Sequence, residues 1–187
     1  MSDLFAEQGQ KAEGLKPLAE RMRPKTVGEV IGQGQILDKT APLGAMLTSK
    51  KLGSLVFWGP PGVGKTTLAR LLADYTNLHF EQISATFSGV ADLKKCFDSA
   101  KLRAAKGRGT LLFVDEIHRF NKTQQDGFLP HMEDGTILLV GATTENPSFE
   151  LNAALLSRAQ VMVLTRLSEP ELAQLLERAE QELCQKL

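Results

Sequence analysis

The chain has 187 residues, 42% of them hydrophobic and 24% charged, and its 22 basic and 22 acidic side chains give a formal net charge of zero. These values are typical of a globular protein with one well-packed domain, and they exclude an overall basic field that would attract nucleic acid or anionic lipid. No apolar run approaches the roughly 20 residues that span a bilayer, and the first residues lack the pattern of a signal peptide. We therefore expect a cytoplasmic protein without a membrane partner, in which Cys96 and Cys184 are ordinary thiols.

The N-terminal part of the chain has weak periodicity. Residues 1–16 are polar and contain glycine, which is typical of a flexible tail. The stretch 26–33 predicts a short helix that ends at Gly32, and residues 42–48 predict a second helix with one apolar face.

From Gly53 onward, short apolar runs alternate with segments of helical spacing. The sequence predicts strands at 54–58, 80–83, 110–114, 136–142 and 161–164. It predicts helices at 66–75, 90–105, 122–132 and 152–157. This alternation predicts an α/β fold in which a five-stranded parallel sheet lies between two layers of helices.

The last segment, 168–187, predicts one more helix. Ser168 and Glu171 form a capping box, and the segment continues with an apolar stripe made of Leu172, Leu175, Leu176, Ala179 and Leu183. A stripe of this kind needs a packing partner. We expect the partner to be missing and the protein to be truncated, with folding back onto the sheet as the alternative.

A phosphate-binding loop lies between the first expected strand and the helix that follows. Its residues fit G-x-x-x-x-G-K-[ST] in full: Gly59, Pro60, Pro61, Gly62, Val63, Gly64, Lys65 and Thr66. Gly62 and Gly64 let the backbone turn its N–H groups toward the β-phosphate of ATP, and the helix N-terminus adds its dipole. We expect Lys65 to reach the β- and γ-phosphates, Thr66 to be a Mg²⁺ ligand and Thr67 to complete the loop.

Polar side chains follow two further strands. Asp115 and Glu116 end the strand at 110–114, and in parallel sheets ligands bind at this carboxyl edge. We expect Asp115 to hold Mg²⁺ through its water shell and Glu116 to polarise the attacking water. After the strand at 136–142, Thr144 is the expected contact to the water or the γ-phosphate, with Thr143 and Asn146 as alternatives.

These motifs in this order resemble an AAA+ ATPase, a P-loop NTPase: the phosphate loop, then LLFVDE, GATTEN and LLSRA. The resemblance gives a role to Arg158, which has no acidic residue within four positions in the sequence. In that family the matching arginine enters the site of a neighbouring subunit, where such a finger is worth roughly 10³–10⁵ in rate. The alternatives are that Arg158 caps the short helix before it or pairs with Glu150.

Two longer motifs are more specific. DEIHRFNKTQQDGFLPHMEDGTI (115–137) and GATTENPSFELNAALLSRA (141–159) are similar to the replication-associated recombination protein A family, whose eukaryotic relatives are the Werner-helicase-interacting proteins. In addition, RPKTVGEVIGQ (23–33) resembles the adenine-side segment of clamp loaders and branch-migration motors. That likeness implies that Arg23, Val30 and Ile31 lie at the nucleotide base.

The resemblance implies three parts: the tail 1–16, a nucleotide-binding AAA+ core at 17–167, and the start of a truncated helical lid at 168–187. It implies a DNA-dependent ATPase of replication-fork maintenance, recombination and repair, with ATP and Mg²⁺ as cofactors. The implied partners are forked or gapped DNA, single-strand-binding protein and further copies of the chain, in a tetramer; a bacterial protein would be associated with the nucleoid. The alternatives are a nucleotide-gated interaction domain without appreciable hydrolysis and a small-molecule P-loop kinase.

The sequence does not assign a single role to three other groups of residues: a basic cluster, His118 and the turn at 84–86. The basic cluster around residues 90–108 predicts either a DNA contact or a solvated helix face; its members are Lys94, Lys95, Lys101, Arg103, Lys106 and Arg108. His118 has no cysteine or second histidine at metal-ligand spacing, so we expect no metal there. By analogy with other AAA+ proteins, the turn at 84–86 is a candidate to hold Glu116 in an inactive orientation.

Overall fold

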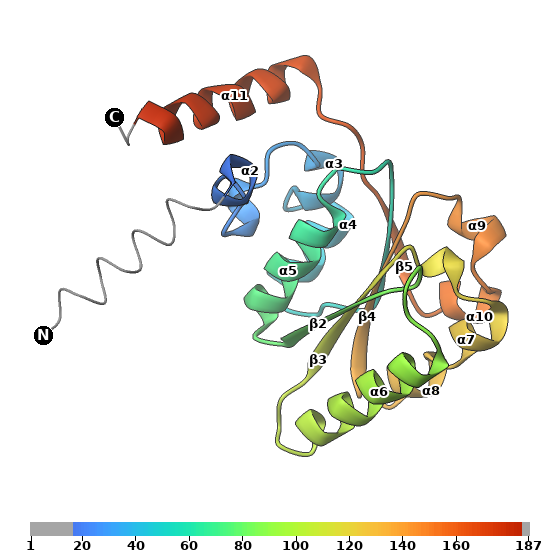
Figure 1. Cartoon of the computed structure of the whole chain (residues 1–187). Helices are drawn as coiled ribbons and strands as arrows, with labels where there is room; N and C mark the ends of the chain where they lie inside the picture. Colours follow the sequence, from blue (N-terminus) through green and yellow to red (C-terminus); the bar gives the residue numbers. More distant parts are fainter. Residues whose placement is uncertain (1–16, 185–187) are drawn as a thin grey trace, which may run out of the picture.

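A parallel sheet forms the centre of the protein in a computed structural model that describes residues 17–184 (Figure 1). Its five strands are β1 (Leu55–Trp58), β2 (His79–Ser84), β3 (Thr110–Asp115), β4 (Ile137–Thr143) and β5 (Gln160–Val163). They are ordered β2-β3-β4-β1-β5, and every neighbouring pair is parallel. The predicted sheet is confirmed, whereas the predicted tail at 1–16 lies outside the described residues.

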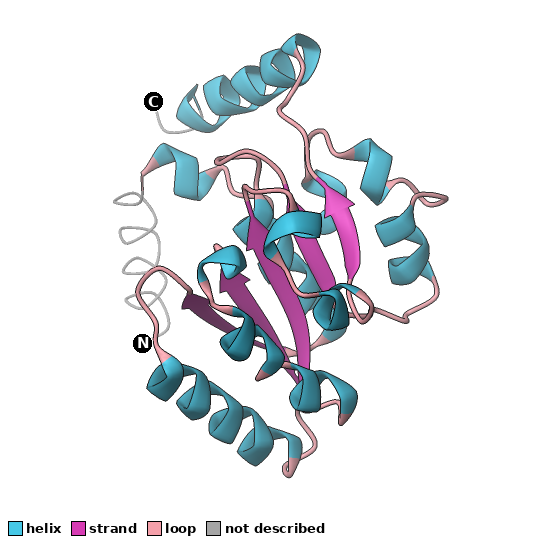
Figure 2. Ribbon diagram, turned by 90° about the vertical axis from the view of Figure 1, so that its right-hand side faces the viewer, coloured by secondary structure: helices cyan, strands magenta, loops and turns pink. Residues whose placement is uncertain are grey.

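Helices cover both sides of this sheet, as the view in Figure 2 shows. On one side pack α3 (Gly34–Leu37), α4 (Pro42–Thr48) and α5 (Lys65–Thr76); on the other lie α6 (Val90–Ala104), α7 (Lys122–Asp126), α8 (Leu129–Glu133) and α10 (Ala153–Leu156). Successive residues of a strand point to opposite sides. In β1, Leu55 and Phe57 pack in the core on the side of α5, and Val56 packs in the core on the side of α6. The period of two in a strand therefore produces the three-layer sandwich.

Two predicted helices have different bounds in the structure. The stretch 26–33 forms only a 3₁₀ turn at Val27–Glu29, because the backbone is already extended at Val30; Gly32 and Gln33, with positive φ angles of 74° and 65°, then turn the chain again. The segment 122–132 is split into α7 and α8. Pro130 explains the break, since it has no N–H for the carbonyl of Asp126 and its ring would clash there in a continuous helix.

Three short helices were not predicted as such: α2 (Leu18–Arg21), α3, and α9 (Pro147–Glu150). Asn146 caps α9 by accepting the N–H of Ser148 at 3.0 Å, and Pro147 occupies the first turn, where its missing N–H costs nothing. Among residues 17–184 no helix combines the length and apolar character needed to cross a membrane.

The C-terminal helix α11 (Glu169–Cys184) lies across the N-terminal segment and not over the sheet (Figure 1). Half of the predicted capping box forms: a carboxylate oxygen of Glu171 accepts the backbone N–H of Ser168 at 2.6 Å, and this bond lowers the pKa of Glu171. The hydroxyl of Ser168 donates to the same oxygen at 2.7 Å. Arg21 donates to Glu182 at 2.9 Å and Arg178 donates to Glu29 at 3.2 Å. The alternative that this helix folds back onto the sheet is therefore wrong. The helix folds back onto the N-terminal segment.

The apolar stripe of α11 is only partly used in this position. Leu175 is half-buried against the N-terminal segment, whereas Leu172, Leu176 and Leu183 are 45%, 65% and 49% exposed.

Candidate active site

The phosphate-binding loop connects β1 to α5, as its motif predicts. Gly62 and Gly64 have φ angles of +80° and +95°, which L side chains rarely adopt. Gly59 is required for a different reason, because an added Cβ would overlap the carbonyl oxygen of Leu164 just beyond β5. The glycines therefore give the loop its curvature and bring it close to the end of β5.

Lys65 is the first residue of α5, and its side chain turns back into this loop. The residue is 8% exposed, and its ammonium donates to the carbonyl oxygens of Gly59 at 2.6 Å and Pro60 at 2.9 Å. Burial lowers the pKa of Lys65, and the negative charges of Glu116 and Asp115 partly oppose this shift. The lysine thus lies in the loop within electrostatic reach of both carboxylates.

The other predicted groups meet at the same carboxyl edge of the sheet. Asp115 is the last residue of β3, Glu116 follows it, and Thr144 follows β4, the neighbour of β3. The hydroxyl of Thr144 donates to a carboxylate oxygen of Glu116 at 3.4 Å. Thr66 lies in the first turn of α5 beside Lys65. The fold therefore brings one cation, two carboxylates and two hydroxyls to one place.

Glu116 has contacts that sequence reasoning missed. It adopts a left-handed backbone conformation with φ of +51°, which is uncommon outside glycine, and the 3₁₀ turn Ile117–Arg119 follows it. Its carboxylate lies 3.3 Å from Nε2 of His118, whose Nδ1 lies 2.9 Å from the hydroxyl of Thr143. Within the described part of the chain no hydrogen bond joins Glu116 to the turn at 84–86.

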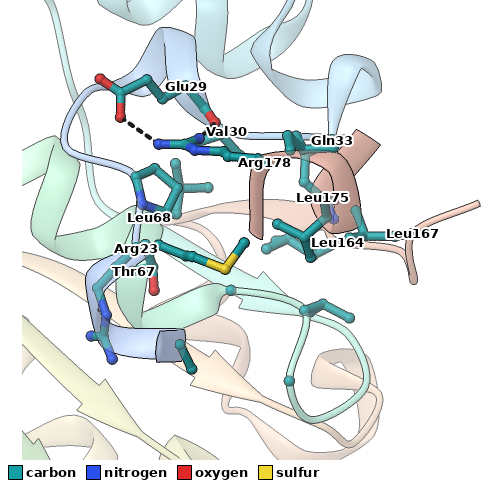
Figure 3. Close-up of a pocket in the computed structure, with 17 residues that line it drawn as sticks. Arg23, Glu29, Val30, Gln33, Thr67, Leu68, Leu164, Leu167, Leu175 and Arg178 are labelled. Carbon is teal, nitrogen blue, oxygen red and sulfur yellow. Dashed lines mark hydrogen bonds and ion pairs between the residues drawn. The ribbon is translucent and has the colours of Figure 1, made fainter. Parts of the chain in front are cut away.

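An apolar pocket of about 380 Å³ opens beside the loop (Figure 3). Its size falls within the range of small-molecule sites. Arg23, Val30 and Ile31 all line it, together with Gly62, Val63, Gly64 and Thr67 of the loop and first turn. The predicted base-side and phosphate-side residues therefore share one cavity.

Helix α11 supplies a wall of this pocket that the sequence did not reveal. Leu175 and Arg178 line the cavity from that side, and Figure 3 shows the ion pair between Arg178 and Glu29 at its rim. The apolar stripe of α11 was visible in the sequence, but its target was not. The position of Arg178 three residues after Leu175 is the signal that a helical-face analysis could have used.

Arg158 lies at the opposite edge of the sheet. It follows α10 and precedes β5, whose first residue, Gln160, pairs with Leu55 at the start of β1. Its guanidinium donates from Nε to Glu133 at 2.7 Å and from Nη1 to the carbonyl of Ala154 at 2.9 Å. The alternative pairing with Glu150 is wrong, whereas the capping of α10 is present. Glu133 of α8 is the acidic partner that the local sequence could not show.

The basic cluster of α6 is partly engaged within the chain. Arg103 pairs with Glu81 of β2, and Lys95 lies 4.0 Å from Asp92. Lys94, Lys101, Lys106 and Arg108 are exposed. Among residues 17–184, no group of three or more histidine, cysteine, aspartate or glutamate side chains has the arrangement of a metal site. Thr66 and Asp115 fit the different requirement of Mg²⁺, which binds few protein oxygens besides water and phosphate.

Comparison with known proteins extends these observations. A model of the ATPase family associated with various cellular activities (AAA) matches residues 55–167. Replication-associated recombination protein A of Escherichia coli K12 is 53% identical over 165 residues, which is 88% of this chain and 37% of that protein. ATPase WRNIP1 of Dictyostelium discoideum is 46% identical over 168 residues, 90% of this chain and 19% of that protein. The chain therefore spans little more than a third of the bacterial relative's length.

The fold also matches solved structures. The Thermotoga maritima RuvB Holliday junction branch migration motor superposes with a TM-score of 0.70 at 32% identity, over 87% of this chain and 55% of that one. A second structure of Thermotoga maritima RuvB gives a TM-score of 0.72 at 31% identity, with the same coverage of both chains. The predicted P-loop fold and the predicted resemblance to these recombination-associated proteins are confirmed.

Proposed function

Because the chain belongs to the AAA family of ATPases, we propose that it binds and hydrolyses ATP for a protein that acts on DNA during replication, recombination and repair. The convergence of Lys65, Thr66, Asp115, Glu116 and Thr144 at one edge of the sheet carries this proposal. The family match and the names of the similar proteins support it. The protein would then work in the cytoplasm, on the nucleoid of a bacterium.

In this proposal the base of ATP occupies the pocket and its phosphates lie on the loop. Arg23, Val30 and Ile31 contact the base side, where the lining is mostly apolar. Phosphate oxygens replace the carbonyls of Gly59 and Pro60 as acceptors for Lys65, which exchanges neutral acceptors for charged ones. The N–H groups of the loop and the N-terminus of α5 add to the attraction.

The chemistry follows from the groups at the strand ends. Thr66 and Asp115 would hold Mg²⁺, which when bound neutralises charge between the β- and γ-phosphates. Glu116 accepts a hydrogen bond and then a proton from the water whose oxygen attacks the γ-phosphorus. The bond from that phosphorus to the β–γ bridging oxygen breaks, so ADP and inorganic phosphate leave. Thr144 adjoins Glu116 and orients the water or the γ-phosphate.

Arg158 supplies the remaining cation from another copy of the chain. It lies at the amino edge of its own sheet and so has no access to the phosphates bound at the carboxyl edge. A homo-oligomer, which we propose is a tetramer, would place it in a neighbouring site. There it would exchange Glu133 for a γ-phosphate oxygen.

DNA is the proposed activator of this ATPase. The resemblance motivates forks, gaps and ends as the DNA structures and single-strand-binding protein as a further partner. On the chain itself, exposed Lys94, Lys101, Lys106 and Arg108 offer phosphate contacts with the strong salt dependence of such binding.

One observation favours a second function for an isolated chain. Lys65 and Arg158 both bind acceptors of their own chain, so neither cation is free without a nucleotide or a second copy. A monomer would therefore act as a nucleotide-gated interaction domain with little hydrolysis.

ATP turnover per chain, measured at rising protein concentration with and without forked DNA, tests both functions. Arg158→Ala is mixed with Lys65→Ala, and each variant is also assayed alone. We expect specific activity to rise with concentration and the mixture to regain turnover, because a Lys65→Ala chain still donates Arg158 to an intact site. Turnover that is absent while ATP still binds supports the interaction domain. Equal activity in the mixture and the separate variants contradicts the action of Arg158 across an interface.

A further inference from the structure

We propose that His118 is a positioning residue that orients the carboxylate of Glu116 and ties it to the phosphate-binding loop through Thr143. This inference rests on the proposed hydrolysis of ATP. The three side chains come from two neighbouring strand ends and are joined by distances of 3.3 Å (His118 to Glu116) and 2.9 Å (His118 to Thr143).

The backbone at Glu116 first places the two side chains together. A φ of +51° at a non-glycine residue costs free energy, and such conformations persist where the surrounding structure requires them. The left-handed residue reverses the chain directly after Asp115 and begins the turn Ile117–Arg119. The imidazole of His118 thereby comes within hydrogen-bond distance of the carboxylate two residues earlier, whereas a continuing strand would hold residues 116 and 118 on one face but about 7 Å apart.

One assignment of hydrogens satisfies the two contacts of a neutral imidazole. The hydroxyl of Thr143 has one hydrogen and two nearby acceptors, Nδ1 of His118 at 2.9 Å and the carbonyl of Glu145 at 3.2 Å. In this assignment it donates to Nδ1, the nearer of the two, and Nε2–H donates to the carboxylate of Glu116. The side chain of His118 is 8% exposed and Thr143 is fully buried, so water does not replace these partners readily. A buried ring with a fixed partner on each nitrogen has one orientation. Its Nε2–H therefore has a fixed direction, and this direction orients the carboxylate of Glu116.

The chain of contacts continues from Thr143 to the phosphate-binding loop. The backbone N–H of Gly59 donates to the carbonyl of Thr143 at 3.2 Å, and Thr144, the next residue, donates to Glu116. His118 and Thr144 thus approach the same carboxylate oxygen from two directions. A shift of the loop or of the end of β4 on binding of the γ-phosphate therefore moves the base that activates water.

Steady-state and single-turnover kinetics of His118→Phe test this role, with His118→Gln as the conservative variant. Phenylalanine retains a ring but no hydrogen bond, whereas glutamine can still donate to Glu116. We expect His118→Phe to lower kcat by about 10²-fold, the scale of a small misplacement in an active site, with the KM for ATP unchanged. We expect His118→Gln to recover part of the loss.

Two controls separate positioning from general damage. His131→Phe makes the same change at a half-buried ring that packs on Phe97, away from Glu116, and should leave kcat unchanged. In a Glu116→Gln background, His118→Phe should cause no further loss, because a residue that acts only through Glu116 has nothing left to orient. A multiplied loss in that double variant, or a loss of ATP affinity in place of kcat, overturns the inference.

Nitrogen-15 spectra of the imidazole provide a readout that does not need hydrolysis. We expect a neutral ring of His118 protonated on Nε2, with signals that shift in Thr143→Val. A ring protonated on Nδ1 contradicts the contacts of His118 with Thr143 and Glu116. Signals that stay unchanged in both Thr143→Val and Glu116→Gln contradict them as well. If these signals hold but the wild-type chain hydrolyses no ATP in any condition, the proposed function is wrong and the role of His118 falls with it. If the wild type is active and His118→Phe equals it, only the inference is wrong.

Discussion

The two edges of the sheet are built differently. At the carboxyl edge, Lys65 is buried and the side chain of Glu116 is 28% exposed, and both are held by turns whose backbone angles only certain residues adopt. At the amino edge, Arg158 and Glu133 form an ion pair whose side chains are 39% and 54% exposed. The first edge holds its groups through contacts and backbone angles of the chain itself. The second presents one polar pair on the surface, which suits a group that must exchange partners.

Glutamate-to-glutamine substitutions at the two edges, Glu116→Gln and Glu133→Gln, test this contrast. We expect the larger effect from Glu116→Gln, at the carboxyl edge. Glu116→Gln keeps the size of the side chain but removes the acceptor for the proton of water. We expect kcat to fall by about 10²–10⁴-fold, while ATP still binds. Turnover and binding of a fluorescent ATP analogue measure the two quantities. A variant that binds nucleotide poorly would show that Glu116 holds the ligand and does not act as the base.

A comparison of the glycines that flank β1 tests the rigidity of the carboxyl edge. In Gly59→Ala the new methyl group overlaps the carbonyl of Leu164, so we expect a loss of about 1–3 kcal/mol in the free energy of unfolding. Gly53→Ala meets nothing within 4 Å and should change that free energy by less than about 0.5 kcal/mol. Urea unfolding measures both. Equal effects would mean that the loop moves to accommodate the methyl group at Gly59 without cost.

The pH dependence of stability follows from two half-buried histidines away from the site. Burial lowers the pKa of His79 and of His131 from 6.5, and positive neighbours add to the shift. Below pH 6.5 the unfolded chain therefore binds protons that the folded chain does not, and the free energy of unfolding falls as the pH falls toward the lowered values. Unfolding between pH 7.5 and 5.5, where carboxylates remain ionised, should be less pH-dependent in His131→Phe. An unchanged pH dependence would exclude His131 as a source.

The smallest effect belongs to the amino edge. Glu133→Gln removes the charge opposite Arg158, and an exposed pair contributes little, so we expect less than about 1 kcal/mol in the free energy of unfolding. Thermal unfolding at matched concentration measures it, and ATP turnover should persist. A loss as large as that of Gly59→Ala would show that the two edges are equally rigid.

Features that depend on neighbouring residues were predictable from the sequence. The phosphate-binding loop and the order of strands and helices follow from local motif and apolar spacing. The break at Pro130 was also readable, because a proline inside a helical pattern removes a hydrogen bond wherever the chain goes. The expected meeting of Asp115, Glu116 and Thr144 needed only the rule that parallel strands end at one edge.

The remaining contacts join residues that are distant in sequence or depend on one backbone angle. Glu133 reaches Arg158 only after the sheet brings α8 beside α10. His118 meets Glu116 because Glu116 is left-handed, a conformation that its residue type disfavours and no sequence pattern announces. Arg178 faces the pocket because α11 rests on the N-terminal segment.

The position of α11 also bears on how fast a nucleotide can be exchanged. Two ion pairs, Arg21–Glu182 and Arg178–Glu29, fasten this helix at its far end and at the rim of the pocket. If the base enters past this helix, the helix must move to admit it. Because partly exposed pairs weaken as salt is added, release of ADP should quicken with ionic strength even where its affinity for the loop is unchanged. The rate at which α11 moves would then limit the exchange of nucleotide, and the ionic strength of the solution would change that rate.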